Sequence, residues 1–204
     1  MKYQKIECVK NDRTLIELQA ALIPASKGEI GRLLDSKSKI KILLSDYSKG
    51  KGASNVFVQA NISCEECQQV FEDAKFFHHF KIKNKYDLKQ VKVFGTYYDE
   101  NKQETDQNIV TKLSIQRIAV DKQGNEMRNP WIITIENGKG KTVEGRNQLD
   151  QSSYTCLKRV SKQLNDLDMN RLFRRADALI KSAELSVFEN NKNDLFTSTY
   201  KENK

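Results

Sequence analysis

The stretch from Ile109 to Lys141 constrains the fold of this chain more than any other. Apolar and polar residues alternate in two runs, one from 109 to 120 and one from 130 to 136. A period of two is typical of β-strands that bury one face. The segment between the runs is polar and charged. The sequence therefore predicts a β-hairpin, with the only tryptophan, Trp131, at the start of its second strand.

A second pattern of two strands and a helix lies earlier in the chain. Its strands are expected at 40–44 and 56–60, and its helix at 64–77, where apolar residues have helical spacing. Ser63 is followed three residues later by Glu66, which fits a capping box at the start of this helix. Within the second strand we expect Phe57 to point into the core.

The later hairpin is also followed by a helical pattern, which predicts a helix from residue 153. The chain is thus expected to have an α+β fold. One compact domain would cover residues 1–188, with a duplicated pair of β-β-α units over about 25–85 and 91–188 as the alternative. Residues 189–204 lack hydrophobic periodicity, so we expect a mobile tail there.

The charge balance favours a polyanionic partner. Lys and Arg number 35 against 27 Asp and Glu, which gives a net charge of +8. A basic protein of this size is a candidate for nucleic-acid binding, although a Lys-rich genome would give the same composition. Two glycine–lysine stretches, 49–52 and 137–141, are predicted as turns. Glycine lets a backbone approach phosphates closely and lysine supplies charge, but a solvated hairpin turn has the same sequence.

The candidate site residues are aromatic or basic. We expect Tyr47, Tyr97 and Trp131 to stack on bases, because aromatic rings in a basic groove hold single strands. Phosphate contacts are expected from Lys49, Lys51, Lys139 and Lys141. On the last helix Arg171, Arg174 and Arg175 share one face, where they could meet phosphates, meet an acidic partner, or lie in solvent.

Cys64 and Cys67 with His78 and His79 form the one pattern that suggests zinc. Adjacent histidines point in different directions, and both cysteines begin a helix on its apolar side, so the pattern favours two buried helix residues over a zinc site. Whether the four bind zinc is left open, and no metal or cofactor is predicted. No hydrolase, metalloprotease, kinase or P-loop motif is present, so we expect a protein that is not an enzyme.

The N-terminus lacks an apolar signal segment, and no apolar run approaches the ~20 residues of a membrane span. We therefore expect a cytoplasmic protein without membrane contact, whose cysteines stay reduced.

The glycine–lysine stretch 49–52, the strand 56–60 and the capped segment 61–71 together resemble PC4/Whirly-like single-stranded DNA-binding domains in layout. The resemblance implies a curved antiparallel sheet backed by helices, which binds single strands without strong sequence preference. Members with two ββββα units fit the length of this chain, although fewer than eight strands are clear in its sequence.

The leading expectation is a cytoplasmic protein that binds single-stranded DNA, in preference to RNA, largely independent of sequence. The alternative is a non-enzymatic protein-interaction module, an inhibitor or accessory factor that docks on an acidic or nucleic-acid-handling partner. A homo-oligomer is compatible with both.

Overall fold

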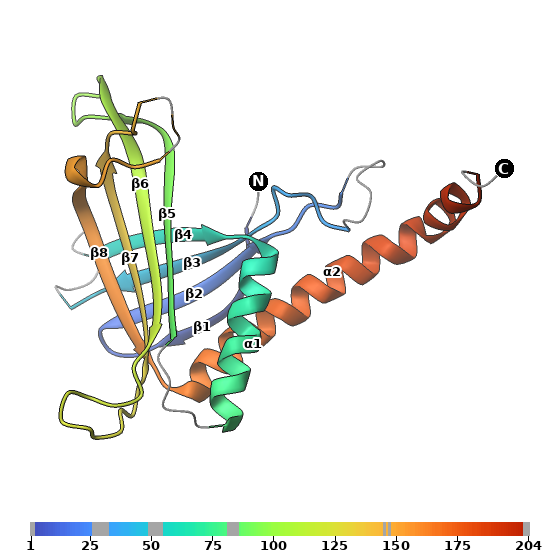
Figure 1. Ribbon diagram of the computed structural model, residues 1–204, viewed down its shortest axis with the longest axis horizontal. Helices are drawn as coiled ribbons and strands as arrows, with labels where there is room; N and C mark the ends of the chain where they lie inside the picture. The colour runs from blue at the N-terminus through green and yellow to red at the C-terminus, as the bar shows by residue number, and fades with distance from the viewer. Residues whose placement is uncertain are drawn as a thin grey trace.

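The computed structural model describes residues 3–25, 33–48, 55–80, 86–144, 146 and 148–201, without the side chains beyond residue 190. It contains two four-stranded antiparallel sheets and two α-helices, so the fold is α+β (Figure 1). Four strands and a helix follow one another twice along the chain.

Sheet I is formed by the first four strands in chain order. They are β1 (Gln4–Lys10), β2 (Thr14–Ala21), β3 (Lys39–Asp46) and β4 (Val56–Ile62). The two strands predicted in this half are confirmed, and every neighbouring pair is antiparallel. Strand β4 forms one edge of the sheet.

Sheet II is formed by the last four strands, again in chain order. They are β5 (Tyr86–Tyr98), β6 (Glu104–Arg117), β7 (Trp131–Gly140) and β8 (Thr155–Leu164). The predicted hairpin is confirmed, because β6 and β7 pair with Leu113 opposite Ile135 and Ile115 opposite Ile133. All four of these side chains are buried, which fixes the register through the hydrophobic face.

Both helices begin at side-chain caps. The first, α1 (Cys64–Phe80), has the predicted capping box: the Ser63 amide donates to Glu66 Oε2 (2.7 Å), and the Glu66 amide donates to Ser63 Oγ (3.1 Å). The second, α2 (Asp166–Lys201), begins after Asn165, whose Oδ1 accepts from the Asp168 amide at 2.7 Å. A short 3₁₀ turn, η2 (Gln151–Ser153), precedes β8.

The helix predicted from residue 153 is confirmed only from Asp166 on, as α2, and is wrong before it, because 155–164 is strand β8. Val160, Lys162 and Leu164 are buried while the residues between them are exposed, which is the period of a strand. Residues 189–201, for which a mobile tail was expected, form the last turns of α2. Nucleation is the costly step of helix formation, and a helix that has already formed extends by one hydrogen bond per residue. The last turns of α2 therefore do not require an apolar stripe.

The two sheets cross and share one core with both helices (Figure 1). Buried side chains of both sheets meet those of α1 and α2 in one cluster, and the two helices pack on each other. Polar contacts join the sheets as well. The buried Lys162 Nζ on β8 donates to the Thr14 carbonyl (3.2 Å) and hydroxyl (3.0 Å), and burial lowers its pKa. Neither helix contains, in its described residues, an apolar stretch that could cross a bilayer.

Asp166, the first residue of α2, joins the helix to sheet II inside this core. Its carboxylate accepts from the Trp131 indole Nε1 at 2.7 Å and from Arg117 Nε and Nη2 at 3.0 and 3.1 Å. The Trp131 ring makes edge contacts with Phe77 on α1 and Tyr86 on β5. One carboxylate thus fixes the helix start against the centre of the core.

Asp166→Ala should lower the free energy of unfolding by about 3 kcal/mol, because it removes the carboxylate from a guanidinium that is almost fully buried. The double variant Arg117→Met/Asp166→Ala should recover much of this loss, since the charge leaves with its partner. Urea unfolding of both variants and the wild type measures the difference. A double variant that is no more stable than Asp166→Ala would show that the buried charge is not the cause.

Candidate nucleic-acid interface

Sheet II passes the β4 edge of sheet I and continues beyond it (Figure 1). The side chains at this crossing line a groove. Its volume is about 440 Å³. One wall comes from β4 and the other from the end of sheet II at which β5 ends and β8 begins. The lining residues are Phe57, Gln59, Tyr97, Tyr98, Ile109, Asn137, Gly138, Leu157 and Lys158.

Asn137 holds the two walls together. Its Oδ1 accepts from the Gln59 amide at 3.0 Å, and its Nδ2 donates to the Gln59 carbonyl at 3.0 Å and to Thr111 Oγ1 at 2.9 Å. The side-chain amide therefore takes the place of a neighbouring strand for one residue of β4. It projects from β7 at a register shift between Asn137 and Gly138, opposite which β8 carries one extra residue, Leu157, in a bulge.

The walls expose apolar side chains to solvent. Phe57 is 44% exposed, Tyr98 55% and Leu157 49%. Exposed apolar side chains gathered in one concave place mark an interaction surface more often than scattered ones do. Phe57 was expected in the core; instead its neighbour Val58 is buried, so Phe57 lies on the opposite face of β4.

The lining of the groove carries positive charge at one place. Its described lining contains no carboxylate, and Lys158 is exposed at its edge. Lys139 Nζ lies 4.8 Å from the centre of the Tyr97 ring, a cation–π distance. The structure thus brings together Tyr97 and Lys139, two of the residues predicted to bind nucleic acid.

Other predicted residues are placed differently. Trp131 is fully buried, so the expectation that it stacks on bases is corrected. Lys141 pairs with Asp106 at 2.5 Å, and this hydrogen bond lowers the pKa of the carboxyl. Tyr47 is half-buried on sheet I, with Lys10 Nζ 5.7 Å from its ring centre. Lys49 and Lys51 lie outside the described residues.

The three arginines of α2 do not line the groove. Arg171 pairs with Asp168 (3.4 Å) and Arg175 with Glu7 on β1 (2.9 Å), while Arg174 is exposed. Helix α2 packs against α1 and β1, whereas the groove wall on sheet I is β4 at the other edge. Any phosphate contact of these arginines would therefore belong to a different surface.

The predicted turn at 137–141 is wrong, because residues 131–140 are strand β7. Glycine is needed there for close packing and not for an approach to phosphate. A Cβ on Gly138 would overlap the Thr155 carbonyl and come within 2.8 Å of Tyr154 Cε2. A Cβ on Gly140 would come within 2.7 Å of Leu149 Cδ1.

Gly138→Ala should lower the free energy of unfolding by about 1–3 kcal/mol, because the added methyl group overpacks the contact between β7 and β8. Gly95→Ala is the matched control, since a Cβ at Gly95 on β5 meets nothing within 4 Å. The control should be neutral or slightly stabilising, as alanine restricts the unfolded chain. Equal unfolding midpoints of the two variants in urea would contradict the packing argument.

The sequence pattern missed Ile109, Leu157 and Asn137 as groove residues. Ile109 belongs to the same apolar run as the buried Leu113 and Ile115, so the sequence does not distinguish it from a core position. No local sequence signal marks where sheet I ends beneath sheet II.

Cys64 and Cys67 are buried in the core, as two helix residues of α1. Burial raises the pKa of the Cys64 thiol to about 11 and raises that of Cys67 further. His78 and His79 are in the last turn of the helix, about 16–18 Å along its axis from Cys67. Among the described residues no three His, Cys, Asp or Glu side chains are grouped so that they could hold a metal ion.

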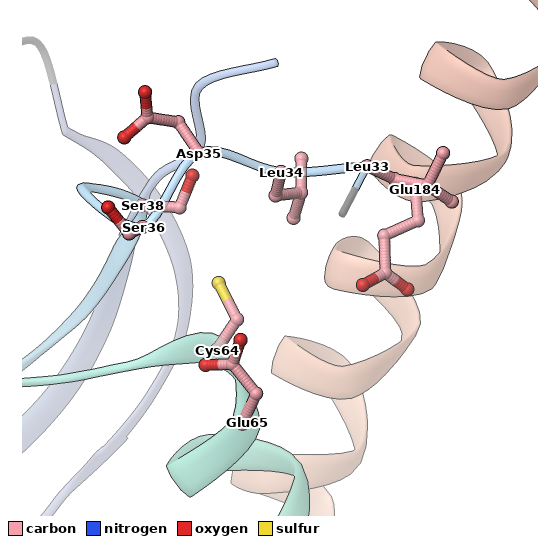
Figure 2. A pocket seen from close by; sticks show the side chains of 8 residues that line it. All are labelled: Leu33, Leu34, Asp35, Ser36, Ser38, Cys64, Glu65 and Glu184. Carbon is pink, nitrogen blue, oxygen red and sulfur yellow. The ribbon is translucent and has the colours of Figure 1, made fainter. Parts of the chain in front are cut away.

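A second cavity, of about 230 Å³, lies between the segment before β3, the start of α1 and the middle of α2. Figure 2 shows the carboxylates of Asp35, Glu65 and Glu184 around it, with the Cys64 thiol on its wall. Burial is the main cause that raises the pKa of Glu184, followed by the charges of Glu65 and Asp177. Carboxylates repel phosphates, so this cavity is unsuited to nucleic acid.

Glu184→Gln should raise the melting temperature at about pH 7. A carboxyl whose pKa is raised by folding destabilises the folded state while it is charged, and this cost disappears as the pH falls through its folded-state pKa towards about 4. The gain should therefore shrink on acidification. Glu104→Gln, at an exposed position on β6, is the control and should show no such trend. Equal pH profiles for the two variants would contradict the burial argument.

Comparison with known proteins adds no assignment. No known family, curated protein or solved structure matches this chain. The resemblance to PC4/Whirly-like domains therefore stays a prediction, and the chemistry of the groove carries the functional argument.

Proposed function

We propose that this protein binds single-stranded nucleic acid in the groove between β4 and sheet II, largely independent of sequence. The observation that carries the proposal is the composition of this one surface. Aromatic side chains are exposed on both walls, two lysines lie beside them, and the described lining has no carboxylate.

Each side chain has a distinct role in this proposal. Phe57 and Tyr98 offer ring faces on which bases stack, a contact that every base can make. Lys139 and Lys158 contact phosphates. Stacking requires bases that are turned out of a helix, so an unpaired strand fits the groove and a duplex does not.

Single-stranded DNA is the first ligand to test, because no contact in the groove demands a 2′-hydroxyl. The proposal assigns binding and no reaction. It also places the protein in the cytoplasm, where the four free thiols would stay reduced.

Fluorescence anisotropy with a labelled oligothymidylate over a salt series tests the proposal. Wild-type affinity should fall as salt rises, since bound phosphates release counterions. Lys139→Ala/Lys158→Ala should weaken binding and reduce the salt slope by about 1.4, because two phosphate contacts of ~0.7 each are lost. Phe57→Ala/Tyr98→Ala should weaken binding about 30-fold or more with the slope unchanged, because two stacking contacts of ~1–3 kcal/mol each are lost and stacking does not involve ions.

Arg174→Ala removes one exposed charge from α2 and serves as the control for net charge. It should bind like the wild type. Absence of wild-type binding at low salt would overturn the proposal. The exposed apolar walls would then favour the alternative of a protein-interaction module, which a pull-down that survives nuclease treatment would support.

A further inference from the structure

The outer face of sheet I continues the β4 wall of the groove. Phe57 pairs with Ser45 on β3, Ser45 with Leu15 on β2, and Leu15 with Lys10 on β1. Directly paired residues point to the same face, so these four side chains form one row across the sheet. At ~4.8 Å per strand the row is about 14 Å long. It leads from the groove to the opposite edge of sheet I.

Tyr47 and Lys10 lie at the far end of this row. Tyr47 follows the end of β3 two residues after Ser45, so it is on the same face, and its amide donates to the Arg13 carbonyl at 2.7 Å. Lys10 Nζ lies 5.7 Å from the centre of its ring. This repeats the pairing of Tyr97 with Lys139 in the groove, an aromatic ring with a lysine beside it.

The outer face is also basic. Lys5 and Lys41 are on it, and Lys41 Nζ lies 3.7 Å from the centre of the Tyr3 ring. Its acidic side chain, Glu17, pairs with Lys5 at 2.9 Å and accepts from Gln19 Nε2 at 2.6 Å. Because Glu17 is already compensated, it opposes a phosphate less than an isolated carboxylate would.

The opposite end of the groove is acidic. Tyr98 is followed by the connection to β6, which carries Asp99 and Glu100, and β6 itself begins with Glu104 and Asp106. Lys141 compensates Asp106. A strand that leaves the groove in this direction would meet several carboxylates, whereas sheet I offers lysines. The charges therefore select the path across sheet I.

We propose that a single strand held in the groove continues over β4 and across the outer face of sheet I to Tyr47 and Lys10. This inference rests on the proposed function. It makes the binding site longer than the groove by the 14 Å row, about four nucleotides at the ~3.4 Å spacing of stacked bases. Tyr47 stacks on a base and Lys10 contacts a phosphate at the far end.

The test compares a short oligothymidylate of about 6 nucleotides with a long one of about 14, both within the range of single-domain sites. Lys10→Ala/Tyr47→Ala should weaken binding of the long oligonucleotide about tenfold and leave the short one unchanged. Phe57→Ala/Tyr98→Ala should weaken both. Melting curves of each variant establish that it is folded, and single replacements of Lys10 and Tyr47 substitute for a double variant that is not.

The outcomes separate the extension from the groove. If the wild type binds both lengths and Lys10→Ala/Tyr47→Ala changes neither affinity, the extension is overturned while the groove site stands. An equal loss for both lengths also overturns it, because the residues would then act on the groove itself. If the wild type binds neither length at low salt, the proposed function fails.

Discussion

The hydrogen bonds between the Asn137 side chain and the backbone of Gln59 decide where one sheet ends and the other continues. An edge strand must satisfy its backbone groups or cover them. The amide of Asn137 satisfies both groups of Gln59 without adding a strand. Sheet II can therefore cross β4 at an angle to its strands. The crossing leaves a shared core on one side of β4 and exposed aromatic side chains on the other.

Local patterns in the sequence predicted the elements that have an apolar face and a polar face or a capped end. The β6–β7 hairpin and the capping box of α1 are of this kind, because a buried face or a cap depends on neighbouring residues. The candidate site depends on where distant strands meet. Tyr97 and Lys139 were predicted because one is aromatic and the other basic. Trp131 was predicted for the same reason, yet it lies in the core. Phe57 was assigned to the wrong face, because alternation alone does not say which face is buried, and it is the flanking Val56 and Val58 that pack on the core.

The two ββββα halves have the same element order but different relations to the groove. Sheet I contributes the face that points away from the core, at Phe57 and Gln59. Sheet II contributes the continuation of its core-facing side, on which Ile109 follows the buried Leu113 and Ile115. The core-facing side of sheet II is exposed at Ile109 because sheet I ends at β4 and does not cover it. Equal order along the chain therefore does not imply equivalent surfaces, and a residue in one half does not predict the role of its counterpart in the other.

The burial of Trp131 has a consequence for spectroscopy. The chain has one tryptophan. Its indole contacts Phe77, Tyr86 and Asp166, none of which is proposed to bind the nucleic acid. Its fluorescence is thus an intrinsic reporter of how the start of α2 is docked. A ligand in the groove leaves the emission unchanged unless its binding is transmitted through the core. Any change in emission on titration would therefore measure long-range coupling between the groove and the helix.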